Sequence, residues 1–448
     1  MSLSAFKDKS LVLVLAYSPF GLGHLRVTDA LAHGLPTEIT PILLGAQDTS
    51  LTTLYRIASI HPLTRLLMLG FEYGLGEELF TYFYRRYMNN HAELLYRQLV
   101  TILDQRIDTP KTMLIVATHF GLAHQLAKIK NRIMKEKNIK IILAVQITDD
   151  SPQYIWYVPG ANVIFAPSMR TAENLLSYAR KFHLPLVKMV VNSYPVSPML
   201  SKELSEEKYK KRIGQLDPKA KAKIHVAIPL SGAAVGMRYY QSLMQHLHAY
   251  TDRFSFHIIG KNAPYTKKFL ETASKEHLAD LHISNTDREV VSAYEKTYQE
   301  ENISLEVTKP SEQAFKALLC PNYIGGSILL FTEPVGRQER DNLYFLKRHH
   351  LIPTEKEQTY LEHASLHNIP LIPKDTIVPA ASHWRGICLP KDSQNAAKFI
   401  VWLLKQGILF QMDINCPKGH RSDETDIHGT HRFWEYLDQL VIKEQLQD

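Results

Sequence analysis

The sequence predicts an α/β protein with two doubly wound parallel sheets, and three observations support this prediction. The chain has 448 residues, which is too many for one ordinary hydrophobic core. Short apolar runs alternate with longer stretches of helical periodicity, a pattern typical of parallel sheets covered by helices. A highly charged segment, 201–223, separates two such series and is interpreted as a linker.

Strands of the first series are expected in the N-terminal half of the chain. Each run is almost continuously apolar, which is typical of strands buried on both faces. Helical stretches lie between most of them. The expected strands are 11–16, 39–44, 113–118, 139–145, 163–166 and 188–191.

The second series repeats this alternation, with helical stretches such as "MRYYQSLMQHLHAY" and "PSEQAFKALL" between the strands. Two Rossmann-like domains facing each other across a cleft would bind ligands at the carboxyl ends of their strands. The expected strands are 224–229, 254–259, 303–308 and 327–331. The expected organisation is an N-terminal Rossmann-like domain (1–200), the linker, a C-terminal Rossmann-like domain (224–400) and C-terminal helices (401–448) that pack back on the N-terminal domain.

Composition narrows the classes of function. The formal net charge is +7, which suits an anionic lipid surface, nucleotide phosphates or nucleic acid. Nucleic acid is the least favoured, since the basic residues are scattered and no recognised module is present. Three cysteines without a C-x-x-C pair disfavour a disulfide scaffold and fit a reducing compartment. We see no secretory signal and no apolar window of about 18 residues that would span a bilayer.

The segment "GLGH" follows the first expected strand. Gly21 and Gly23 permit a tight turn and a close approach of backbone to ligand. His24 then lies at a helix N-terminus, where the dipole favours a neutral imidazole that can accept a proton. His24 is our first candidate for a general base, and a capping or packing histidine is the alternative. The second candidate is Asp149, within "TDD" at 148–150.

Two segments of the second half are candidates for ligand binding. In "KPSEQAFKAL", Pro310 and Ser311 open a helix with Glu312 in its first turn. Such a helix could bind a phosphate while Glu312 accepts hydrogen bonds from a ribose diol; an ordinary capped helix is the alternative. The cluster "QERDN" at 338–342 opens another helix, and its amide and carboxylate could bind several sugar hydroxyls, unless it is only a polar first turn.

These segments, in this order, resemble glycosyltransferases of the GT-B type. The most similar group contains monogalactosyldiacylglycerol synthases and the peptidoglycan N-acetylglucosaminyltransferase that acts on a lipid-linked acceptor. The resemblance rests on a G-x-G-H turn, a T-D segment followed by a tryptophan, and the donor-site motifs of the second half. The matching residues are Gly21, Gly23, His24, Thr148, Asp149, Trp156, Ser231, Gly232, Ser311, Glu312, Gln338, Glu339 and Asn342.

The resemblance implies transfer of a sugar, with inversion, from a nucleotide diphosphate to a hydroxyl, and uridine is the expected base. His24 or Asp149 would take the acceptor proton, with Gly21, Gly23 and Thr148 on the acceptor side. Backbone N–H groups near Ser231, Gly232 and Ser311, with Arg337 or Lys309, would stabilise the diphosphate. Gln338, Glu339 and Glu312 would orient the sugar and ribose, and Asn342 completes the donor motif. No cofactor or metal is expected.

The segment 51–107 is the best clue to the acceptor. It is rich in Leu, Phe, Tyr and Met with Arg interspersed, as in helices that lie in a membrane interface. An ordinary buried helical pair is the alternative. We therefore expect a cytoplasmic protein, peripheral on the inner face of the membrane, with a lipid or lipid-linked acceptor. A nucleotide-sugar 2-epimerase, a transferase with a soluble acceptor and a non-enzymatic nucleotide-sugar binder remain as alternatives.

Overall fold

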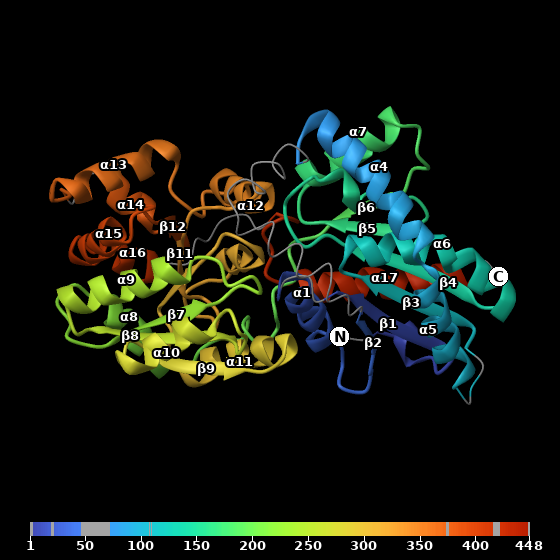
Figure 1. Ribbon diagram of the computed structural model, residues 1–448, viewed down its shortest axis with the longest axis horizontal. Coiled ribbons are helices and arrows are strands. Elements are labelled where there is room, and N and C mark those ends of the chain that lie inside the picture. Colours follow the sequence, from blue (N-terminus) through green and yellow to red (C-terminus); the bar gives the residue numbers. More distant parts are fainter. Residues whose placement is uncertain are drawn as a thin grey trace. The chain divides into compact units, whose positions relative to one another are not determined.

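The computed structural model describes residues 3–18, 22–45, 72–106, 108, 110–372, 376–414 and 422–446. The chain forms two compact units. Unit 1 comprises Met1–Pro198 and Arg421–Asp448, and unit 2 comprises Met199–His420. Figure 1 shows the elements of both units. Among the described helices, none is both long enough and apolar enough to cross a membrane.

Unit 1 contains a six-stranded parallel sheet with the order β2-β1-β3-β4-β5-β6. Strand β3 is buried along its whole length and β4 at every residue except its first, because helices cover both faces. The strands are β1 Leu11–Tyr17, β2 Ile42–Gly45, β3 Thr112–Ala117, β4 Lys140–Gln146, β5 Val163–Ala166 and β6 Lys188–Val191. The helices are η1 Ala5–Lys7, α1 Leu22–His33, α4 Gly74–Asn90, α5 Glu93–Asp104, α6 Phe120–Lys137, η2 Tyr154–Trp156, α7 Met169–Lys181 and α17 Gly429–Gln445.

Unit 2 contains a second six-stranded parallel sheet, with the order β12-β11-β10-β7-β8-β9. This is the strand order of the dinucleotide-binding Rossmann fold. The strands are β7 Ile224–Pro229, β8 Phe254–Lys261, β9 Asp280–Ser284, β10 Leu305–Thr308, β11 Ile328–Phe331 and β12 Gly386–Cys388. The helices are α8 Glu206–Leu216, α9 Met237–Tyr250, α10 Lys267–Lys275, α11 Asp287–Glu300, η3 Glu312–Leu318, α12 Arg337–Arg348, α13 Glu355–Leu366, α14 Ile377–Ala381, α15 Ser393–Lys405 and α16 Ile408–Ile414.

The C-terminal helix α17 lies with the N-terminal elements of unit 1 (red among blue and cyan in Figure 1). The indole N–H of Trp434 donates to the carbonyl of Leu31 at 2.8 Å, and its ring packs edge-on against Phe6. Unit 2 begins at Met199 and includes α8, which packs against α16. The segment expected to be a linker therefore contributes a helix to unit 2, and α16 belongs to that unit as well.

Several local expectations need correction. The strands β9 and β12 were not predicted. The segment after Ser311 forms a 3-10 helix of seven residues, and the Ser311 side chain makes no cap hydrogen bond. Cys320 is disulfide-bonded, whereas Cys388 is a free thiol. Scarce cysteine therefore did not exclude a disulfide in this chain.

Candidate functional site

The candidate base lies where the sheet of unit 1 reverses its winding order. Strand β1 has β2 on one side and β3 on the other, so the connections after β1 and β3 cover opposite faces. Ligands of α/β sheets bind at the carboxyl ends of the strands at such a switch point. His24 follows β1 in the first turn of α1, and Thr118 and His119 follow β3 directly. The helix already includes Leu22 and Gly23, so His24 lies inside its first turn. Gly21 is outside the described residues.

Hydrogen bonds fix the orientation of the His24 ring. Its Nδ1 lies 2.7 Å from the carbonyl oxygen of Thr118, which can only accept. Nδ1 therefore carries the proton, and the neutral ring has its lone pair on Nε2. The hydroxyl of Thr28 donates to the carbonyl of His24 at 2.8 Å and lies 2.7 Å from the hydroxyl of Thr118. These contacts hold α1 against the end of β3.

A carboxylate reaches the same ring through one hydroxyl. Thr148 Oγ1 is 3.3 Å from His24 Nδ1, and Thr148 donates to Asp149 Oδ2 at 3.4 Å. Asp149 is half-buried, whereas Thr148 is buried. The structure therefore brings His24, Thr148 and Asp149 together in one chain of polar contacts. Such a chain can stabilise an imidazolium that forms when His24 takes a proton.

The neighbouring Asp150 has a structural role. It is fully buried, accepts hydrogen bonds from Ser168 and Thr171, and lies 3.9 Å from Arg170. Ser168 is the N-cap of α7. The carboxylate therefore organises the start of that helix.

Aromatic rings surround the candidate base. His119 packs edge-on against His24 with ring centroids 4.8 Å apart, and it stacks on Phe120. Burial, with a smaller effect of His24, lowers the pKa of His119 well below its usual range. Trp156 is fully buried with its centroid 6.1 Å from that of His24. The sequence reasoning did not identify His119; the signal was a histidine directly after a buried apolar strand, in "VATHFG".

Two buried polar atoms at this end of the sheet have no hydrogen-bond partner within the described part of the chain. They are Ser18 Oγ, directly after β1, and the indole nitrogen of Trp156. Buried polar atoms in native proteins are nearly always paired with protein or water. Of these two residues, Trp156 lies against the His24 ring.

The donor-site candidates lie at the corresponding place in unit 2. The winding of this sheet reverses between β7 and β10. Ser231 and Gly232 follow β7, Lys309 follows β10, and α12 follows β11. The three strands are adjacent, so these residues share one edge of the sheet. Two of the loop residues, Ala234 and Gly236, have φ of +48° and +91°, which makes the turn into α9 tight.

Charged groups gather where β10 and β11 end. Lys309 is 7% exposed and its Nζ lies 3.9 Å from Glu339 Oε1. The other oxygen of Glu339 accepts from the backbone N–H of Val335 at 2.6 Å. Asn342 is fully buried and donates to the carbonyl of Pro310 at 3.1 Å, which ties α12 to the segment that follows β10. The Lys309–Glu339 pair and the Asn342 hydrogen bond therefore both join α12 to the segment that follows β10.

The remaining donor candidates border this group. Arg337 opens α12 and pairs with Asp341 at 3.3 Å, while Gln338 is half-buried in the same turn. Ser311 and Glu312 lie at the start of η3 and are half-buried. Ser231 Oγ is buried without a partner among the described residues, and the carbonyl of Gly232 accepts from Tyr265 at 3.0 Å.

The sequence matches no protein-family model. It also matches none of the curated proteins. Solved structures are similar in fold at low identity. TcCGT1 in complex with UDP aligns with a TM-score of 0.50 and 9% identity over 97% of this chain and 100% of that chain. UDP-GlcNAc 2-epimerase from Neisseria meningitidis bound to UDP-GlcNAc has a TM-score of 0.47 and 13% identity over 95% and 99%. MurG of Acinetobacter baumannii has a TM-score of 0.42 and 10% identity over 96% and 99%.

The strand orders and the fold likeness to TcCGT1 confirm the predicted fold class, which is two Rossmann-like units of the GT-B kind. At such low identity, the likeness concerns the fold alone.

Proposed function

We propose that this protein is an inverting glycosyltransferase that moves a sugar from a nucleotide-diphosphate sugar, UDP-linked, to a hydroxyl of a lipid or lipid-linked acceptor. The observation that carries the proposal is the ring of His24, which lies at a sheet switch point with Nδ1 bound to the carbonyl of Thr118. A ring held in this tautomer is suited to act as a general base through Nε2.

The proposed reaction is a single displacement. The acceptor oxygen attacks the anomeric carbon while the bond from that carbon to the diphosphate oxygen breaks. The acceptor proton passes to His24 Nε2, and the leaving diphosphate takes the bonding electrons. The new imidazolium is balanced by Asp149 through the hydroxyl of Thr148.

The donor is assigned to unit 2. Lys309 and Arg337 would face the diphosphate, helped by backbone N–H groups beside Ser231 and Gly232. This proposal needs no metal ion at the reacting centre. Glu339 and Gln338 would bind sugar hydroxyls, and Glu312 would accept from the ribose diol. Uridine is supported by the fold likeness to TcCGT1, whose structure contains UDP.

A lipid acceptor is supported by helix α4, which has hydrogen-bonding polar groups on its buried face and apolar side chains on its exposed face. Its inner face is anchored by polar groups: Glu77 accepts from the N–H of Tyr154 at 2.7 Å, and Arg85 donates to the carbonyls of Tyr154 and Tyr157. Its outer face carries an apolar stripe at helical spacing, with exposed fractions between 39% and 76%. The stripe consists of Leu75, Leu79, Phe80, Tyr82, Phe83 and Tyr87.

The stripe suits insertion at head-group depth on an anionic surface. We therefore propose a peripheral membrane protein of the cytoplasmic face. Within the segment 51–107, from which the lipid acceptor was predicted, residues 51–71 and 107 lie outside the described residues.

The test combines a binding and a turnover assay on the full chain. The purified protein is sedimented with vesicles that are half neutral and half anionic lipid, while release of nucleoside diphosphate is measured with a panel of nucleotide sugars. We expect vesicle binding and lipid-dependent release of UDP from one donor. In Leu79→Glu we expect weaker sedimentation, with little change in Asn89→Glu, which adds the same charge elsewhere on α4.

Other outcomes would redirect the proposal. UDP release without vesicles, stimulated by a soluble alcohol or sugar, would establish a transferase with a soluble acceptor. Interconversion of the nucleotide sugar with its 2-epimer, without net UDP release, would establish an epimerase. UDP binding without either reaction would leave a nucleotide-sugar binder and would contradict the role of His24.

A further inference from the structure

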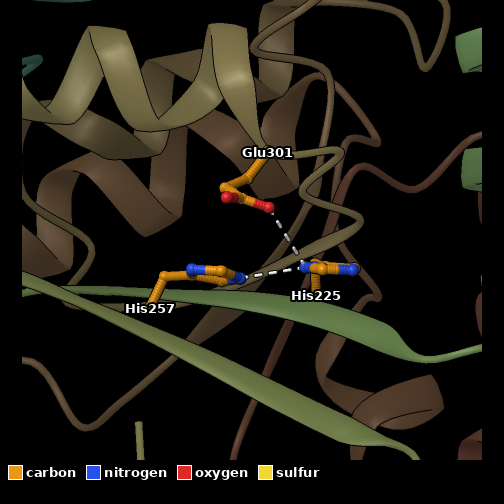
Figure 2. A group of neighbouring side chains, drawn as sticks. All are labelled: His225, His257 and Glu301. Atoms are coloured by element: carbon orange, nitrogen blue, oxygen red, sulfur yellow. Dashed lines mark hydrogen bonds and ion pairs between the residues drawn. The ribbon is translucent and has the colours of Figure 1, made fainter. Parts of the chain in front are cut away.

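A second cluster of titratable side chains lies at the opposite end of the unit 2 sheet. His225 is on β7, His257 is on the neighbouring strand β8, and Glu301 directly follows α11. His225 Nδ1 is 2.9 Å from His257 Nε2 and 3.7 Å from Glu301 Oε2, and the three ligand atoms lie within 4.8 Å of one another. Figure 2 shows these atoms converging from the two strands and the helix end.

The spacing of the three atoms fits a small tetrahedral ion. Two ligand atoms that are each about 2.0–2.1 Å from a tetrahedral Zn²⁺ lie roughly 3.4 Å apart. The two distances from His225 Nδ1, 2.9 and 3.7 Å, lie on either side of this value. The third pair, His257 and Glu301, lies within 4.8 Å, so the Glu301 side chain, which is 37% exposed, would turn toward His257 to complete the set.

The electronic state of the imidazoles also suits a metal. Two neutral ring nitrogens that face each other can share only one proton, so a cation would replace that proton and bind both lone pairs. The carboxylate of Glu301 adds negative charge to the group.

Further polar side chains hold His257 and His225 in place. His257 Nδ1 is 3.3 Å from His282 Nε2 on β9 and 3.8 Å from Asp280 Oδ2. Metal-binding histidines usually donate their second ring N–H to such partners, which fix the ring and the tautomer. The His225 backbone is held as well, because its N–H donates to Gln215 at 2.9 Å.

Access is available from one side. His257 has 2% side-chain exposure, whereas the side chains of His225 and Glu301 are 28% and 37% exposed. An ion can enter from solvent and keep a water as its fourth ligand. The site is distant from the donor residues, since His225 and Ser231 are six residue steps apart along extended β7 and its following turn, which corresponds to about 20 Å.

We propose that His225, His257 and Glu301 bind a divalent transition-metal ion, for which Zn²⁺ is the best match to a donor set of two imidazoles and one carboxylate. The ion joins β7, β8 and the end of α11 at the amino end of the sheet. Its role is to stabilise unit 2 and not to take part in the reaction, so this inference does not depend on the proposed function.

The first test is calorimetric titration of the chelator-treated full chain with Zn²⁺. We expect one equivalent to bind, and the affinity to fall by about tenfold or more in Glu301→Gln and in His225→Gln. The matched controls are Glu300→Gln and His246→Gln, which change the same residue types on the surface of unit 2 and should bind as the wild type does. Absence of stoichiometric binding, or equal affinity in all variants, would overturn the proposal.

A second measurement needs no variant and therefore does not depend on their folding. X-ray absorption at the Zn edge of the loaded wild-type protein should show a first shell of nitrogen and oxygen with the outer-shell scattering of two imidazoles. A first shell that contains sulfur, or fewer than two imidazoles, would place the ion elsewhere and contradict the assignment.

Discussion

In unit 1 the sheet reverses its winding between β1 and β3, and in unit 2 between β7 and β10. The side chains at the two points differ in kind. Unit 1 places His24 and His119 there, among aromatic rings. Unit 2 places Lys309, paired with Glu339, and Arg337. The same topological position thus holds two imidazoles in one unit and charged side chains in the other, as expected if one unit activates a hydroxyl and the other binds a diphosphate.

The largest expected effect comes from removing the base of unit 1. His24→Ala should lower turnover by about 100-fold or more, since a positioned general base contributes that much. Steady-state UDP release measures this effect. The matched control is His33→Ala, which changes an exposed histidine at the end of the same helix. Turnover that is the same in both variants would remove His24 from the reaction.

A smaller effect is expected in unit 2. Glu339→Gln retains the size of the side chain but removes its charge beside Lys309, so the donor should bind about 10-fold to 100-fold more weakly. Glu333→Gln is the control, because Glu333 forms only a surface pair with Lys391. Competition binding with UDP-sugar separates the two variants, and equal affinities would exclude Glu339 from donor binding.

Thr148→Val tests the link between His24 and Asp149. The substitution keeps the shape but removes the hydroxyl that touches both residues. We expect about a tenfold loss of kcat with KM unchanged, and a lower pKa in the acidic limb of the pH–rate profile, because the imidazolium loses its stabilisation. Rescue of kcat by Thr148→Ser would support this role, whereas a purely structural role would leave the pH profile unchanged.

The smallest expected effect concerns stability, and it comes from a buried carboxylate of unit 2. Asp413 is fully buried, neither of its oxygens has a hydrogen-bond partner among the described residues, and burial raises its pKa to about 6 against the attraction of Arg212 and Arg385. Both arginines donate to backbone carbonyls instead.

The raised pKa of Asp413 determines whether its contribution to the free energy of unfolding rises or falls with pH. Below pH 3.8 Asp413 is protonated in both the folded and the unfolded chain. Between pH 3.8 and 6 only the unfolded form ionises, so the contribution of Asp413 to stability falls with rising pH and is constant above pH 6. Urea unfolding should show that Asp413→Asn gains on the order of 1 kcal/mol relative to wild type between pH 4 and 7. A difference that does not vary with pH would contradict the raised pKa.

Sequence patterns were sufficient for the strands that are buried on both faces. The apolar runs 113–118 and 139–145 predicted the buried strands β3 and β4 within one residue at each end. The strand β9 was missed because the polar residues Asp280, His282 and Ser284 alternate with its two apolar ones, and β12 because it has only three residues, including Gly386. Neither strand has the continuous apolar run on which the prediction depended.

The candidate site residues, like the strands, were predicted only where a local sequence pattern marks them. His24 and Glu339 lie in local motifs, so the sequence could suggest them. His119 lies at the site through its packing against His24. His225 and His257 lie on neighbouring strands but are 32 residues apart in the sequence. Adjacency across a parallel sheet has no local spacing rule, because the crossover length varies. Only the strand order reveals such clusters.

Calorimetric titration of UDP into wild type and His24→Ala, and of UDP-sugar into wild type and Glu339→Gln, tests the division of roles most directly. The account predicts that His24→Ala binds UDP with wild-type affinity although its turnover is lost, and that Glu339→Gln binds UDP-sugar more weakly than wild type. UDP affinity that falls with His24→Ala, together with donor affinity that is unchanged in Glu339→Gln, would contradict the assignment of proton transfer to unit 1 and donor binding to unit 2.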